Sequence, residues 1–198
     1  MEKIEDLLDF GFVVIDKPEG PTSHQVSSWV KEILNVKKAG HAGTLDPNVS
    51  GVLPVALNRA TKIVNLLHLL DKEYVALLYL HGKADEKRIR NVFKEFVGEI
   101  YQTVPVRAAV SRKTRIRKIY SLDIIEIEER NVLFRVSTES GTYIRTLCVD
   151  LGDAIGTGGN LLELRRIRTG HLHEDSSHTL QELKDAYEFY KEGDESYL

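Results

Sequence analysis

Apolar residues in the first third of the chain alternate between a strand-like run and a helical stripe. Residues 12–15 form an apolar run that ends at the Pro and Gly cluster of 16–21, which is typical of a buried strand followed by a turn. Thr22 and Gln25 have the spacing of a capping box, so a helix is expected to begin there. Its predicted core-facing positions recur at helical intervals: Val26, Trp29, Val30, Ile33 and Leu34.

The middle of the chain continues this alternation. Residues 52–57 predict a short strand, in which Pro54 favours an edge or a bulge. We expect a helix over 60–70, followed at 73–81 by a strand that is apolar on both faces, as in the middle of a sheet. Asp85 can cap another amphipathic helix, whose apolar stripe is Ile89, Val92, Phe93 and Phe96.

Strands dominate the pattern after Gly98. Segments around 104–106, 119–128 and 132–138 predict strands, and the last two form an expected antiparallel hairpin. Three further elements complete the pattern: a helix over 141–155 ended by glycines at 156–159, a strand over 160–168, and a capped helix over 179–190.

Interleaved helices and strands with a clear hairpin predict an α+β fold with a mixed, largely antiparallel sheet flanked by helices. The 198 residues, 42% hydrophobic and 29% charged, suffice for one well-buried core. No internal repeat, low-complexity tract or linker is evident, so we expect a single domain over residues 1–198.

Cysteine usage and hydropathy predict an intracellular, cytoplasmic protein. The single cysteine, Cys148, sits on an apolar helical stripe, so it forms no internal disulfide and needs no oxidising compartment. No apolar run approaches the length that crosses a bilayer, and the acidic N-terminus does not resemble a secretory or transit peptide. We therefore expect no membrane partner.

Charge is unevenly distributed, which matters for a nucleic-acid partner. The formal net charge of -3 argues against one, but acidic residues crowd the two ends of the chain. The interior carries basic clusters at 37–38, 112–118 and 165–168, each of which is more often a solvated face than a binding site. Composition therefore permits RNA binding without requiring it.

Metal and nucleotide sites find little support. His171, His173 and His178 lack a second pair of closely spaced ligands, so no metal site is expected. The glycines at 156–159 lack the strand, helix and Lys-Ser/Thr of a phosphate cradle, so they are interpreted as a helix stop.

A polar loop over 37–51 is the most informative segment. Asp46 precedes a proline there, and an Asp-Pro pair is by itself most often a turn. His41 and the neighbouring glycines favour function, because glycines let the backbone approach a substrate closely, and Leu45 is an unusual choice for a solvated turn.

Together these segments resemble the TruB family of RNA pseudouridine synthases, in the right order and over nearly the whole chain. The segment Gly-His-x-Gly-Thr-Leu-Asp-Pro at 40–47 is highly specific. The other matching segments are 14–18, 20–24, 72–74, 141–145 and 164–166.

The resemblance implies a set of site residues and a reaction without a cofactor. Asp46 would be the catalytic aspartate, Arg145 its salt-bridge partner and Tyr74 the ring that packs on the target base. Substrate-binding positions would be His41, Tyr143, Leu164 and Lys17. The carboxylate would attack C1′ of the uridine or remove its C2′ proton, and both routes stay open. The nucleotide must be flipped out of stacked RNA.

The branch of the family is indicated by the short connection at 80–85, which resembles the archaeal and eukaryotic dyskerin-like proteins of box H/ACA particles. Residues 147–152 are closer to the bacterial form. The expected partners are substrate RNA in rRNA or tRNA, an H/ACA guide RNA and small accessory proteins, with a nucleolar location in a eukaryote. Dyskerin-like proteins continue into a PUA domain, which we expect to be absent from this chain.

Three alternatives remain. The nearest is a stand-alone enzyme that acts on the tRNA T-loop. A catalytically silent RNA-binding scaffold is disfavoured by the presence of Asp46, Tyr74 and Arg145. A glycosidase would need a second carboxylate partner for Asp46, and the sequence offers no clear one.

Overall fold

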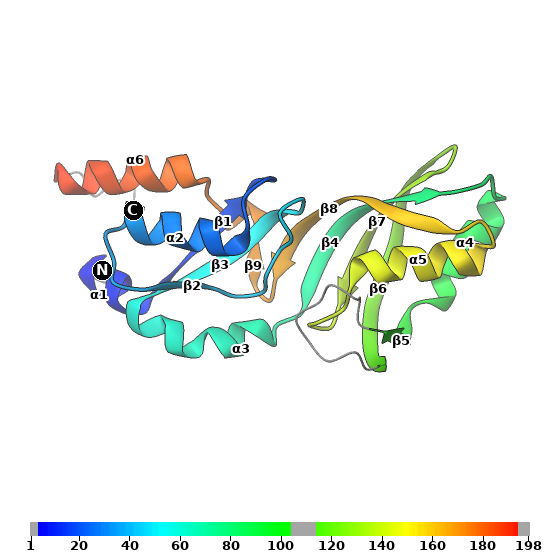
Figure 1. Ribbon diagram of the computed structural model, residues 1–198, viewed down its shortest axis with the longest axis horizontal. Helices are drawn as coiled ribbons and strands as arrows, with labels where there is room; N and C mark the ends of the chain where they lie inside the picture. Colours follow the sequence, from blue (N-terminus) through cyan, green and yellow to red (C-terminus); the bar gives the residue numbers. More distant parts are fainter. Residues whose placement is uncertain (1–3, 104–113, 194–198) are drawn as a thin grey trace. The chain divides into compact units, whose positions relative to one another are not determined.

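The computed structural model describes residues 4–103 and 114–193 (Figure 1). Its internal contacts divide the chain into two compact units, which we describe separately. The terminal unit comprises residues 1–70 and 166–198, and the central unit comprises residues 71–165. The single domain expected from the sequence stays a prediction, as does the strand expected around 104–106, which lies outside the described residues.

The terminal unit is built around strand β3 (Ser50–Leu57), which has antiparallel neighbours in β1 (Phe12–Lys17) and β2 (Ala39–His41). Strand β8 (Gly159–Thr169) is the next strand in the sheet order, and its last residues belong to this unit. The remaining elements are α1 (Ile4–Phe10), α2 (Ser23–Ile33), the 3-10 helix η1 (Asn58–Ile63), α3 (Val64–His68), β9 (Leu172–His173), the 3-10 helix η2 (Glu174–Ser176) and α6 (Leu180–Lys191).

Helix α2 covers the sheet of the terminal unit, and α6 packs against α2 (Figure 1). Val26, Val30 and Leu34 are buried against apolar residues of β1 and β3. Trp29 is 40% exposed, so its predicted place in the core is wrong. The buried stripe is narrower than the predicted one, and Trp29 lies at its flank.

Pro54 is not on an edge strand, as the sequence had suggested, because β3 has neighbours on both sides. Pro54 pairs with Val14 of β1, and its carbonyl accepts a hydrogen bond from the backbone N–H of Ala42. The last β2 pair is His41 with Val55. The missing N–H of Pro54 therefore points to the position just beyond the end of the β2 ladder, where the strand loses little by lacking a donor.

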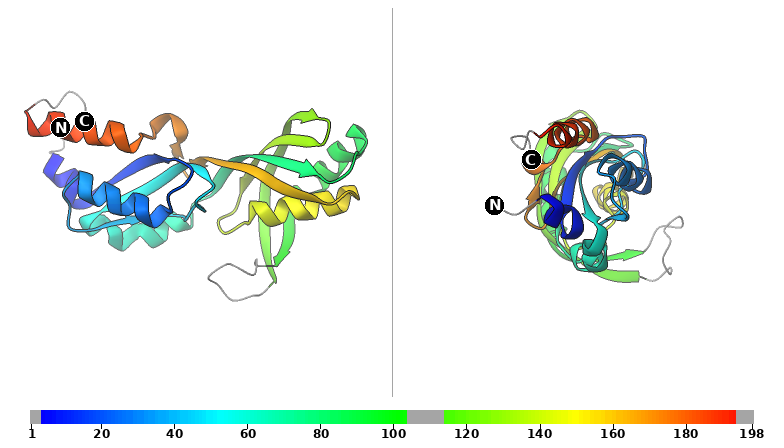
Figure 2. Two further views of the ribbon diagram at one scale, coloured as in Figure 1. Left: turned by 45° about the horizontal axis from the view of Figure 1, so that its top comes forward. Right: turned by 90° about the vertical axis from the view of Figure 1, so that its left-hand side faces the viewer.

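The central unit holds an antiparallel sheet with two helices on one face. Its elements are β4 (Lys72–Leu80), α4 (Glu86–Glu95), β5 (Gly98–Thr103), β6 (Thr114–Glu128), β7 (Asn131–Thr138), α5 (Ile144–Ile155) and the first part of β8. The strand order is β8-β4-β7-β6-β5. Figure 2 shows α5, drawn in yellow, along the strands of this unit.

Apolar residues of α4 and α5 fill the central core against β4, β6 and β7. Phe93 and Phe134 meet edge to face with ring centroids 5.4 Å apart. Cys148 lies in the same cluster, and burial raises the pKa of its thiol to about 12, so this thiol stays protonated and inert at neutral pH. The face of β4 opposite this core is only partly buried, less than the sequence suggested.

Most predicted element boundaries are confirmed because local chemistry sets them. Thr22 and Thr179 form capping boxes, Asp85 caps α4, and Gly156 ends α5 in the left-handed conformation. The predicted helix over 60–70 is a 3-10 turn followed by a short α-helix, and β5 was not predicted.

The fold class is confirmed as α+β with a mixed, mostly antiparallel sheet flanked by helices. Among the described residues, no helix is both long and apolar enough to span a membrane.

Gly51 permits a close approach of β3 to β8. Its φ is +106°, and a Cβ atom would lie 2.1 Å from the carbonyl oxygen of Arg166. We expect Gly51→Ala to lower the free energy of unfolding by about 3 kcal/mol or more, because strain and a backbone clash add.

Gly20→Ala is the matched control, since Gly20 has a φ of +108° with nothing within 4 Å of its Cβ position. It should lose only the conformational part, about 1–2 kcal/mol. Urea unfolding of both variants measures the difference, and equal losses would contradict the clash.

Candidate functional site

The Asp46 loop, residues 42–49, connects β2 to β3 in the terminal unit. Three apolar residues, Ala42, Leu45 and Val49, are buried and anchor the loop, whereas Asp46 is exposed. The backbone N–H of Val49 bonds to the carbonyl of Asp46 at 3.0 Å and closes a turn. Leu45, whose presence in a polar loop was unexpected, is therefore an anchor that directs the next side chain outward.

Lys17 ends β1 and is fully buried, with 0% of its surface exposed. Its ammonium group donates to the carbonyls of Pro18 at 2.8 Å, Pro47 at 3.2 Å and Val49 at 2.8 Å. Burial lowers the pKa of Lys17, while Glu19 and Asp46 act in the opposite direction. Lys17 thus holds the backbone of the Asp46 loop, and its predicted contact with substrate stays a prediction.

Arg166 is a second buried cation at this loop, 1% exposed, which the sequence analysis did not assign to the site. Its Nε donates to the carbonyl of Val52 and its Nη2 to the carbonyl of Gly43, both at 2.8 Å. The two carbonyls lie on either side of Asp46 in the sequence. The only sequence signal for Arg166 was its place in the Leu-Arg-Arg segment at 164–166.

His41 is half-buried beside the loop, and the hydrogen bonds of its neighbours indicate its tautomer. The hydroxyl of Ser27 donates its hydrogen to the carbonyl of Ser23 at 2.9 Å, so Nδ1 of His41, 3.0 Å from the same oxygen, is the donor to it. In neutral His41, Nε2 then accepts from the hydroxyl of Thr44 at 3.2 Å. Burial lowers the pKa of His41, and His68, His24 and Arg166 lower it further.

His68 of α3 supports the start of the same loop. Its Nδ1 accepts a hydrogen bond of 3.0 Å from the backbone N–H of Gly43. This nitrogen must be unprotonated to accept, so the contact holds only in neutral His68.

The central unit carries the other predicted site residues, and Gln102 of β5 fixes one of them. Tyr143 is the N-cap residue of α5, and Arg145 is exposed in the first turn of this helix. The Gln102 side chain, 2% exposed, accepts from the N–H of Tyr143 at 3.0 Å and donates to its carbonyl at 3.1 Å. Gln102 therefore sets where α5 begins.

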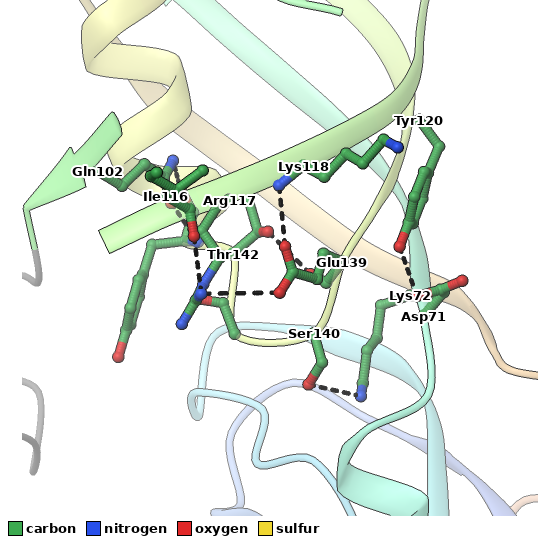
Figure 3. A network of polar contacts seen from close by, with 12 residues as sticks. Asp71, Lys72, Gln102, Ile116, Arg117, Lys118, Tyr120, Glu139, Ser140 and Thr142 are labelled. Atoms are coloured by element: carbon green, nitrogen blue, oxygen red, sulfur yellow. Dashed lines mark hydrogen bonds and ion pairs between the residues drawn. The ribbon is translucent and has the colours of Figure 1, made fainter. Parts of the chain in front are cut away.

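Figure 3 shows the polar contacts that shape the loop before α5. Arg117 donates from Nε to the carbonyl of Gly141 at 3.1 Å and lies 3.8 Å from the Glu139 carboxylate. The same carboxylate accepts from the backbone N–H of Lys118 at 3.1 Å. In the predicted phosphate-binding run 112–118, Arg117 and the backbone of Lys118 thus have structural contacts as well.

Tyr74 and Leu164 pack against the central core. Tyr74 on β4 is paired with Val136 of β7 and is partly buried, as is Leu164 on β8. Lys17, His41 and Asp46 thus lie in the terminal unit, and Tyr74, Tyr143, Arg145 and Leu164 lie in the central unit. The predicted pairing of Asp46 with Arg145 stays a prediction. No cluster of metal-ligating side chains occurs among residues 4–103 and 114–193.

Protein-family models match nearly the whole chain. The model described as the TruB family pseudouridylate synthase N-terminal domain matches residues 31–87 and 81–144, and that of the tRNA pseudouridylate synthase B C-terminal domain matches residues 145–198. The chain belongs to the TruB family.

Curated TruB-family relatives agree with this assignment. A probable tRNA pseudouridine synthase B from Methanocaldococcus jannaschii is 57% identical over 99% of this chain and 59% of its own length. Its namesake from Archaeoglobus fulgidus is 55% identical over 98% of this chain and 60% of its own length. The chain therefore spans about 60% of the length of these relatives.

Solved structures place this TruB-family chain beside proteins of archaeal type. A chain in a Cbf5-Nop10-Gar1 complex is similar over 99% of this chain and 60% of its own, with a TM-score of 0.95 and 53% identity. A chain of an H/ACA RNP bound to a substrate RNA containing 2′-deoxyuridine covers 99% and 59%, with a TM-score of 0.90 and 51% identity.

The lowered pKa of His41 predicts an acid-dependent loss of stability. Its folded-state pKa lies below the ordinary 6.5, so the unfolded chain binds more protons, and the free energy of unfolding falls as pH drops from 6.5 through the folded-state value. The contribution is complete above 6.5. We expect His41→Asn to flatten the decline measured by urea unfolding between about pH 7.5 and about pH 5.

The control for this measurement is His171→Asn, because His171 is exposed. It should keep the acid dependence of the unaltered chain. Identical slopes for the two variants would contradict the assigned environment of His41.

Proposed function

We propose that this chain is the catalytic part of an RNA pseudouridine synthase that works within a box H/ACA particle. The observation that carries the proposal is the exposed Asp46 on a loop whose backbone is held by two buried cations, in a TruB-family chain. Similarity to chains of H/ACA structures at 50–53% identity supports the choice of particle.

The reaction isomerises uridine by breaking the C1′–N1 bond, turning the uracil and closing a C1′–C5 bond. Asp46 is the proposed catalytic residue, as nucleophile at C1′ or as base for the C2′ proton. An ionised carboxylate serves both routes, and the Arg145 guanidinium is proposed to keep it ionised. No group is lost and no redox change occurs, so we expect no cofactor.

Binding requires the target nucleotide to leave the RNA stack. This step costs a few kcal/mol, and stacking of the base on the Tyr74 ring offsets part of it. We propose that Tyr143, Leu164 and His41 line the pocket and that basic residues at 37–38 and 112–118 contact phosphates. Lys17 acts in this scheme through the loop backbone that it binds.

The proposed partners are substrate RNA in rRNA or tRNA, an H/ACA guide RNA and small accessory proteins. Such proteins are named in the related complexes as Nop10 and Gar1. We expect this particle to act in the cytoplasm, or in the nucleolus if the source is a eukaryote.

Asp46→Asn tests the catalytic assignment. Amide substitution keeps the size of the side chain but removes the nucleophile or base, so uridine isomerisation should fall by about 10³-fold or more. Release of tritium from 5-tritiated uridine in RNA measures the rate in the reconstituted particle. Asp123→Asn, an exposed carboxylate on β6, should retain full activity, and substantial activity in Asp46→Asn would sink the mechanism.

A second candidate is a stand-alone tRNA enzyme, which the names of the curated relatives favour. The two candidates differ in what the full-length protein does without guide RNA. We expect slow or no isomerisation of tRNA by the protein alone, and fast isomerisation of a guide-paired uridine once guide RNA and accessory proteins are added. Equally fast modification of a tRNA T-loop by the protein alone would favour the second candidate.

A further inference from the structure

Ser23, the first residue of α2, has a hydroxyl that the helix itself does not need. Thr22 and Gln25 already form the capping box that satisfies the start of α2. Ser23 is 1% exposed, and its hydroxyl accepts from the N–H of Leu45 at 2.8 Å and donates to the carbonyl of Leu45 at 2.9 Å. One hydroxyl thus satisfies both backbone groups of a single buried loop residue.

This contact lies immediately before the proposed catalytic carboxylate. The carbonyl of Leu45 belongs to the peptide unit that joins Leu45 to Asp46. Because that unit is planar, fixing its oxygen also fixes the backbone nitrogen of Asp46 and the direction in which its Cα leaves. Only the torsions of Asp46 itself then separate the Ser23 hydroxyl from the position of the carboxylate.

We propose that Ser23 is a positioning residue for Asp46 and acts through the Leu45 peptide; the proposal rests on the function proposed above. Reaction rates are sensitive to such positioning, since a displacement of about 1 Å can cost about 10²-fold.

The other supports of the loop act on different groups. Lys17 binds the carbonyls of Pro47 and Val49, and Arg166 binds those of Gly43 and Val52. Removing the Ser23 hydroxyl therefore leaves these four anchors in place and releases the peptide between residues 45 and 46. The expected result is a folded loop with a misplaced carboxylate.

Ser27 links the same turn of α2 to the start of the loop. Its hydroxyl donates to the carbonyl of Ser23 and accepts from the His41 ring. Ser23 is consequently held from its own backbone while its side chain holds Leu45. This arrangement is the reason to expect a defined position for the Ser23 hydroxyl.

The test compares Ser23→Ala with Ser23→Cys and Ser28→Ala in the full particle with guide RNA. Ser23→Ala removes both hydrogen bonds, and Ser23→Cys keeps the volume while weakening both. Ser28→Ala is the matched control, because Ser28 is exposed on the same helix and its hydroxyl lies 3.5 Å from the Glu32 carboxylate. Single-turnover isomerisation rates and the Kd for substrate RNA are measured for each.

We expect Ser23→Ala to reduce the single-turnover rate by about 10²-fold with the RNA Kd changed less than about threefold. Ser23→Cys should fall between Ser23→Ala and the unaltered protein, and Ser28→Ala should match the latter. Faster hydrogen exchange at the Leu45 amide in Ser23→Ala reports the lost bond without reference to activity.

Two results would overturn the proposal. One is an unchanged rate in Ser23→Ala despite a faster-exchanging Leu45 amide. The other is a parallel loss of rate and RNA affinity in both Ser23 variants, which indicates general damage to the fold. If Ser23→Ala does not fold, the split between rate and Kd in Ser23→Cys decides. Activity that survives in Asp46→Asn is a separate outcome, which removes the proposed function and not the Ser23 contact.

Discussion

Hydrogen bonds from buried cations to main-chain carbonyls hold the Asp46 loop, and the rest of the candidate site in the terminal unit depends on them. Lys17 and Arg166 bind four carbonyls of residues on both sides of Asp46. A buried charge is tolerated when such partners replace its water, and hydrogen bonds to charged groups contribute about 1.5–3 kcal/mol each. A loop without regular structure thereby satisfies its backbone as a sheet does.

A second device recurs at the two predicted catalytic segments. Ser23 bonds both backbone groups of Leu45, one residue before Asp46, and Gln102 bonds both backbone groups of Tyr143, two residues before Arg145. In each case a buried polar side chain replaces a missing strand partner. The charged side chain that follows is left to face solvent while its backbone is held.

Local chemistry made much of the fold predictable from the sequence. The capping boxes at Thr22 and Thr179 depend on residues three apart, so the helix starts could be placed correctly. Predictions failed where burial depends on partners distant in sequence. Trp29 has the right helical spacing for the core but lies at the flank of the buried stripe, and Pro54 sits inside a sheet because β2 ends beside it.

The sequence by itself determined the family, the fold class and Asp46 as the candidate carboxylate, because these are recorded in short motifs and local periodicity. Only the tertiary structure decided what Lys17, Arg166 and Ser23 contact. Their partners lie 22 to 123 residues away in the longest cases and are backbone atoms, which carry no side-chain identity for a sequence pattern to record. The supports of a catalytic loop are therefore visible only once the chain has folded around it.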